Sequence, residues 1–161
     1  MVLTNDDILF NLFTNIIMIY KHTQTGYLIL VILFVVALLF KFVLDQAGFD
    51  NFVLAIMIVV LFVVASFVSL TVMIDQEYLR IKFGYGFFRK RFLLEDIVSV
   101  KMVRNHWYYG WGIRFWMWPR MWIFNISGFD AVEIMMKKGS VYRIGTDEPK
   151  ELEHAISQVV K

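Results

Sequence analysis

The sequence predicts a membrane protein of the α + β class, in which apolar helices precede a small domain of short strands. Hydrophobic residues make up 59% of the chain, whereas about half is usual for a soluble domain. Two long apolar segments occupy its first half, and short runs of alternating apolar and polar residues follow them. Such runs are typical of half-buried strands. We therefore expect a helical membrane anchor and one β domain.

Two segments have the composition of membrane spans. Residues 26–44 are apolar except for Lys41, and residues 52–74 contain no charged residue. Because about 20 apolar residues in a helix cross the hydrocarbon core, both are expected to cross, as a transmembrane hairpin over residues 23–74. The linker between them holds two Asp and no basic residue, whereas basic residues flank the outer ends of both spans. The positive-inside rule then predicts a multi-pass protein with both termini in the cytoplasm.

The segment before the first span, residues 1–22, separates on a helical wheel. Leu9, Leu12 and Ile16 fall on one face, and Asp7 and Asn11 fall on the other. This pattern is typical of a helix that lies in the membrane interface. A helix that packs on a partner protein is the alternative.

The segment after the second span, residues 75–161, is expected to be the β domain. Turn signals divide it into seven strand-like runs, at residues 79–83, 87–93, 97–103, 112–118, 121–126, 131–137 and 141–144. A proline at residue 149 then opens a segment in which Leu152, Ala155 and Ile156 recur at helical spacing. Seven strands and one amphipathic helix predict a small barrel or sandwich that the helix closes.

Five motifs occur in the order expected of one protein family. They are YKHTQTGY, GFFRKRFLLEDIVSV, WYYGWGIR, NISGFDAVEI and RIGTDEPKELEHAI. The chain resembles the bacterial membrane-anchored proteins that carry a pleckstrin-homology-like (bacterial PH) domain. The resemblance implies a seven-stranded split barrel with a C-terminal capping helix, and a place in the bacterial inner (cytoplasmic) membrane. It implies no settled activity.

The residues that carry enzyme chemistry are sparse. The three histidines lie in three different segments without a close acidic pair, and there is no cysteine. No nucleophile elbow, phosphate-binding loop or metal-ligand spacing occurs. We expect no catalytic residue, no metal site and no cofactor, and hence a protein that is not an enzyme.

Positive charge gathers in the first half of the β domain. Residues 79–120 hold nine Lys or Arg against two acidic residues, and residues 121–161 hold five against six. Lys82, Arg89, Lys90 and Arg91 flank the first turn of the domain and form the predicted lipid contact. General attraction to an anionic leaflet is the simpler interpretation. A specific site for a lipid headgroup is the alternative.

All five tryptophans lie between residues 105 and 125. Nucleic-acid stacking is not favoured, because the domain is tethered to the membrane. Alternation in the strand at residues 112–118 places Arg114, Trp116 and Trp118 on one face, and an unpaired guanidinium disfavours that face as barrel interior. An aromatic contact surface is therefore predicted, comprising Trp107, Trp111, Trp116 and Trp118.

These observations predict a non-enzymatic membrane protein whose cytoplasmic domain binds the membrane surface, a partner protein or copies of itself. The alternative is an accessory subunit of a transporter or envelope-assembly complex. The expected partners are membrane lipid and a membrane protein or a second copy of the chain, without nucleic acid.

Overall fold

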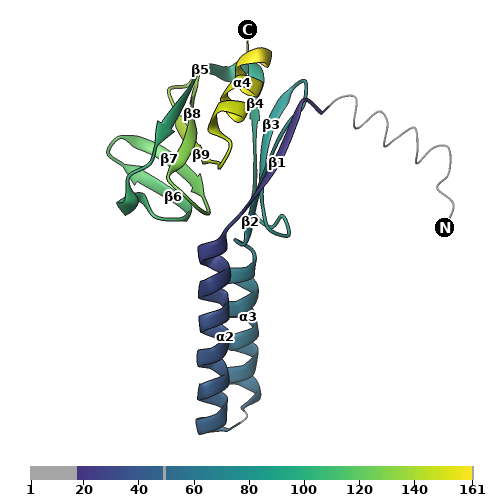
Figure 1. Cartoon of the computed structure of the whole chain (residues 1–161), viewed down its shortest axis with the longest axis vertical. Helices are drawn as coiled ribbons and strands as arrows, with labels where there is room; N and C mark the ends of the chain where they lie inside the picture. The colour runs from purple at the N-terminus through teal and green to yellow at the C-terminus, as the bar shows by residue number, and fades with distance from the viewer. Residues whose placement is uncertain (1–17, 49, 161) are drawn as a thin grey trace, which may run out of the picture.

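The computed structural model describes residues 18–48 and 50–160, and it consists of two apolar helices joined to a β-rich domain (Figure 1). The elements are β1 (Tyr20–Thr25), α2 (Tyr27–Ala47), α3 (Asn51–Ala65), β2 (Ser69–Ile74), β3 (Tyr78–Phe83), β4 (Arg89–Leu93), β5 (Ile97–Arg104), β6 (Gly112–Met117), β7 (Arg120–Asn125), β8 (Asp130–Met136), β9 (Val141–Gly145) and α4 (Pro149–Val159). Short 3₁₀ turns cover Leu94–Asp96 and Trp107–Tyr109.

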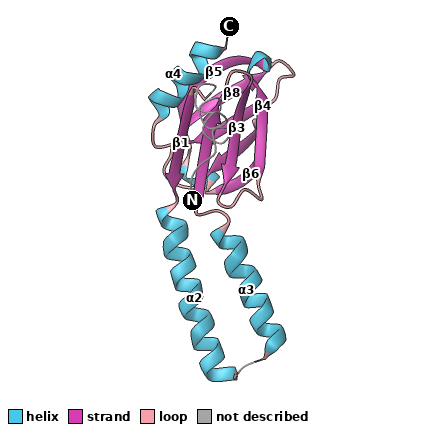
Figure 2. Ribbon diagram, turned by 90° about the vertical axis from the view of Figure 1, so that its right-hand side faces the viewer, coloured by secondary structure: helices cyan, strands magenta, loops and turns pink. Residues whose placement is uncertain are grey.

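The two apolar helices lie side by side and run in opposite directions (Figures 1 and 2). Residues Tyr27–Gln46 of α2 are long and apolar enough to cross a membrane, and α3 is shorter. The predicted extent of the second span, to Ile74, is wrong. The helix ends at Ala65, and Ser69–Ile74 continue as β2 because Leu70, Val72 and Ile74 alternate into the core of the domain.

A strand precedes the first helix. β1 pairs with β2 in antiparallel register, from Tyr20 opposite Ile74 to Thr25 opposite Ser69. The predicted helix over residues 1–22 is therefore wrong from Tyr20 onward, and residues 1–17 lie outside the described residues. Since β1 and β2 belong to the β domain, the predicted domain start at residue 75 is also wrong. Both ends of the helical pair join the same sheet.

The β domain consists of two sheets that face each other. Sheet A has the order β1-β2-β3-β4, and sheet B has the order β5-β8-β9-β7-β6 with a parallel β7–β9 pair. All seven predicted strands are present as β3–β9, but the described chain holds nine, so the seven-stranded count is wrong. The predicted closing helix is confirmed as α4, which buries Leu152 and Ile156 against the core.

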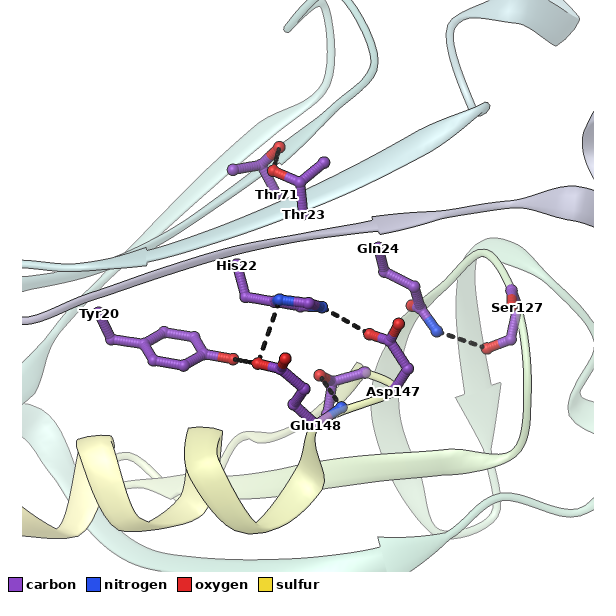
Figure 3. A network of polar contacts seen from close by, with 9 residues as sticks. Tyr20, His22, Thr23, Gln24, Thr71, Ser127, Asp147 and Glu148 are labelled. Atoms are coloured by element: carbon purple, nitrogen blue, oxygen red, sulfur yellow. Dashed lines mark hydrogen bonds and ion pairs between the residues drawn. The ribbon is translucent and has the colours of Figure 1, made fainter.

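A polar cluster ties β1 to the start of α4 (Figure 3). The His22 Nε2 lies 2.6 Å from the Asp147 Oδ1, and its Nδ1 lies 3.1 Å from the Glu148 Oε2. The Tyr20 hydroxyl donates to the same Glu148 carboxylate, and burial together with that negative charge raises the pKa of Tyr20. The sequence predicted that the histidines have no acidic residues close to them. This prediction is wrong for His22, because Asp147 and Glu148 reach it from the far end of the chain. Both imidazole nitrogens of His22 thus have an acidic partner, and these contacts hold β1 beside the start of α4.

A three-strand ion-pair cluster gives the domain a predictable response to acid. Glu133 on β8 pairs with Arg143 at 2.7 Å and with Lys101 at 2.9 Å. Burial alone would raise the pKa of Glu133, but hydrogen bonds from Lys101 and Arg143 and their charges lower it overall. A folded-state pKa below the unfolded value contributes stability that is present above the unfolded pKa and lost as pH falls through the folded one.

We therefore expect Glu133→Gln to lower the free energy of unfolding at neutral pH by about 1.5–3 kcal/mol, as for a hydrogen bond to a charged group. The difference from the parent should shrink as pH falls below the ordinary glutamate pKa of about 4.3. It should vanish once the pH is below the lowered folded-state pKa of Glu133, where the parent carboxylate also becomes neutral. Thermal unfolding of the full chain as a function of pH measures both. Glu151→Gln, on the exposed face of α4, is the control, and identical pH profiles for the two variants would contradict the prediction.

Candidate functional site: a basic hairpin at the helix ends

The basic hairpin consists of β3, β4 and the turn at residues 84–88. In the antiparallel register of β3 and β4, Lys82 lies opposite Arg89, Arg80 lies opposite Arg91, and Ile81 lies opposite Lys90. Because successive side chains of a strand point to opposite faces, the first two pairs lie on the outer face of sheet A. Lys90 shares the inner face with the buried Ile81. The structure thus brings three of the four predicted lipid-contact residues onto one face and separates Lys90 from them.

Four cations meet on this outer face, and we call Arg80, Lys82, Arg89 and Arg91 the outer cation face. Arg80 pairs with Asp75 at 2.7 Å. Among the described residues, the other three form no ion pair. Like charges that face each other across two strands destabilise a sheet, so the arrangement favours an external anion. Guanidinium and ammonium groups can hold a phosphate through charge-assisted hydrogen bonds.

The turn of the basic hairpin packs on the end of α3. The Phe62 ring stacks on Tyr85 with centroids 6.0 Å apart and meets Phe87 edge-on at 5.4 Å. Phe67, just past the helix, stacks on Phe88 at 5.1 Å. Tyr85 and Phe87 nevertheless remain 69% exposed. This apolar tip adjoins the outer cation face. In the sequence, the aromatic residues directly before Arg89 are the pattern from which the tip could have been predicted.

The predicted aromatic contact surface is divided among three environments. Trp116 packs against Tyr109 at 4.9 Å, and its indole N–H donates to the Trp118 carbonyl at 2.8 Å. Trp107 and Trp118 are 77% and 90% exposed. Trp111 lines a groove beside the helix ends. Arg114 and Trp116 lie on the face of β6 opposite Ile113, which packs against the main core. The ring of Tyr108 connects Trp107 to Trp116, with centroid distances of 6.0 Å and 5.7 Å.

The fifth tryptophan, Trp122, lines a cleft between the two sheets. This inter-sheet cleft has a volume of about 300 Å³, and sheet A contributes Ile81, Phe83 and Lys90 to its wall. Small-molecule sites in proteins begin at about this size. Sequence reasoning omitted Trp122, because only the packing of sheet A on sheet B distinguishes an indole in a cleft from one on a surface.

Metal ligation has no support in the part of the chain that the structure describes. No group of three or more His, Cys, Asp or Glu residues there is placed to hold a metal ion.

Comparisons of the chain with protein-family models, with curated proteins and with solved structures found no match. The functional interpretation therefore depends on the geometry of this chain.

Proposed function

We propose that the chain is a membrane-anchored, non-enzymatic binding protein whose β domain engages anionic lipid headgroups through the basic hairpin. The observation that carries the proposal is the position of the outer cation face directly beyond an aromatic turn that packs on an apolar helix. Aromatic rings favour the membrane interface. Each basic residue near an anionic leaflet contributes roughly 1 kcal/mol of attraction.

The dimensions of the hairpin fit a headgroup layer. A bilayer of about 40–45 Å with a hydrocarbon core of about 30 Å leaves some 5–8 Å of headgroup region on each side. Strands rise about 3.3 Å per residue, so Lys82 and Arg89 stand roughly one headgroup layer from the turn. Arg80 and Arg91 follow two residues further along the strands, roughly 7 Å away, which is within the Debye length of about 8 Å at physiological salt.

The pairing of β1 with β2 supports a multi-pass anchor. If α2 crosses the bilayer, the chain must return through α3, because the strands at the two outer ends of the helical pair are hydrogen-bonded to each other. We infer that the short α3 crosses with the help of the following turn, residues 66–68, and of local thinning of the bilayer. The basic residues near this side favour the cytoplasm, in a bacterial inner membrane.

The pleckstrin-homology-like assignment stays part of this proposal. In its favour are the seven strands β3–β9 followed by α4. The strand before the helices and the parallel β7–β9 pair are departures from the simple seven-stranded expectation.

Association with a protein is a second candidate function, either with a second copy or as an accessory subunit of a transporter or envelope-assembly complex. Met117, Trp118 and Trp107 are 76%, 90% and 77% exposed on sheet B and its adjoining turn. Such side chains are enriched at the centres of protein interfaces. Mass measurement of the complex extracted from membranes tests this function separately.

Hydrogen exchange of the full chain in nanodiscs tests the headgroup contact. We expect residues 84–91 to exchange more slowly in discs that contain phosphatidylglycerol than in discs of phosphatidylcholine alone, and added salt should reduce the difference. The variant Lys82→Gln, Arg89→Gln, Arg91→Gln should abolish it. Its thermal stability should equal or exceed that of the parent, because like-charge pairs are removed.

The matched control removes three exposed charges elsewhere, as Arg104→Gln, Arg120→Gln, Lys150→Gln. This variant should keep the protection by phosphatidylglycerol. Protection that survives in the hairpin variant, or that is absent from the parent, would overturn the proposal. A response to one anionic headgroup and not to another of equal charge would instead establish the specific headgroup site.

A further inference from the structure

The inter-sheet cleft is lined mainly by apolar side chains, and the side chains of the core leave it unfilled. Sheet A contributes Phe83 and the turn residue Phe88, and sheet B contributes Ile113, Trp122 and Phe124. Trp122 remains 41% exposed, although the residues before and after it, Met121 and Ile123, are buried. A gap between packed sheets is unusual, because protein interiors are close-packed. The cleft is therefore a candidate binding site.

Two cations, Lys90 on the inner face of sheet A and Arg89 at its edge, line this cleft. The inner face of sheet A carries His22, Val72, Ile81 and Lys90 in one row across its four strands. Lys90 also lines a second cavity, of about 330 Å³, to which Arg91, Lys137 and Lys138 contribute further positive charge and Asp96 contributes one negative charge. Within the described part of the chain, Lys90 forms no ion pair. An ammonium group beside an apolar wall is complementary to a ligand that is anionic at one end.

The cleft adjoins the apolar surface of the helices. Ile113 lines both the cleft and a third, open groove of about 640 Å³. Leu28 and Ile32 of α2 and Val63 of α3 form the helical side of that groove. An apolar surface thus runs from the helical pair, past Ile113, to the cleft and Lys90.

We propose that the inter-sheet cleft binds one anionic lipid from the surrounding bilayer, with its acyl chain against Phe83, Ile113 and Trp122 and its phosphate on Lys90. The inference rests on the proposed membrane anchor and concerns the inner face of sheet A, while Arg89 of the outer cation face also lines the cleft. The apolar route supplies the acyl chain from the bilayer, and the cations around the second cavity supply the charge complementarity. A neutral lipid would leave the Lys90 charge without a partner, so the site selects for an anionic headgroup.

Fluorescence of Trp122 in the full chain tests the proposal. The other four tryptophans are changed to Phe, and the variant is placed in nanodiscs whose lipids carry bromine on the acyl chains. Bromine quenches an indole on close contact, so brominated phosphatidylglycerol should quench Trp122 more strongly than brominated phosphatidylcholine at equal bromine content. Lys90→Gln should abolish the difference, and Lys150→Gln, which removes an exposed charge on α4, should preserve it.

Equal quenching by the two lipids, or no quenching by either, would overturn the proposal and would indicate another occupant such as a protein side chain. If the four Trp→Phe changes prevent folding, native mass spectrometry of the parent replaces the fluorescence. A retained phosphatidylglycerol that is lost in Lys90→Gln supports the site, and its absence from the parent contradicts it. Neither readout depends on slow exchange at residues 84–91, so the cleft and the outer cation face can fail separately.

Discussion

A single cysteine at Lys21 or at Ser140 should react with a membrane-impermeant thiol reagent from one side of the membrane only, and a cysteine at Gln46 from the other side only. The natural chain has no cysteine, so each introduced thiol is the sole target. Lys21 lies on β1 before the first helix, Ser140 lies between β8 and β9, and Gln46 lies near the far end of α2. The expected effect is all or none.

The physical reason is the sheet that joins both ends of the helical pair. Six residue pairs connect β1 to β2, from Tyr20 opposite Ile74 to Thr25 opposite Ser69. Strands on opposite sides of a bilayer could not form these backbone hydrogen bonds, so the paired strands must lie on the same side. Lys21 and Ser140 should therefore share one compartment, which the proposed topology predicts to be the cytoplasm.

The control is labelling after the membrane is made permeable, when all three cysteines should react to the same extent. Labelling of Gln46→Cys from the same side as Lys21→Cys would contradict the prediction. It would mean that the helical pair lies on one side of the membrane. Opposite labelling of Lys21→Cys and Ser140→Cys would contradict the sheet itself.

Gly84→Ala should be the most destabilising single change at the junction between the helices and the domain. Gly84 has a φ of +41°, and a Cβ there would overlap the Ser66 carbonyl oxygen at the end of α3. The neighbouring atoms are backbone, so they cannot move without shifting the helix end. We expect a loss of at least about 3 kcal/mol, in the range of changes that disrupt packing and backbone together.

Gly139→Ala is the matched control for this prediction. Gly139 also has a positive φ, of +77°, but a Cβ there meets nothing within 4 Å. Its loss should stay near the roughly 1–2 kcal/mol that a left-handed conformation costs an L-residue. Thermal unfolding of the two full-length variants, followed by near-ultraviolet circular dichroism, measures the difference. Equal losses would show that strain at the turn, and not contact with Ser66, limits Gly84.

The amino-acid sequence by itself determined the local structure of this protein. Short strand-like runs at residues 79–144 predicted all seven strands from β3 to β9. The alternation is clearest in β3, whose Leu79, Ile81 and Phe83 are buried while the residues between them are not. The spacing of Leu152, Ala155 and Ile156 likewise predicted α4. The apolar composition of Tyr27–Gln46 predicted α2, the helix that is long and apolar enough to cross a membrane. In each case the determining pattern lies within one segment.

The tertiary structure decided which distant segments meet. Ser69–Ile74 is uncharged like the helix before it, and it forms a strand through its pairing with β1 and β3. Likewise, His22 meets Asp147 and Glu148 only because β1 lies beside the start of α4. Lys90 is separated from Arg89 and Arg91 only when one face of sheet A is buried against sheet B. These features depend on contacts between residues far apart in the chain, and a local pattern of hydrophobicity or charge carries no information about such partners.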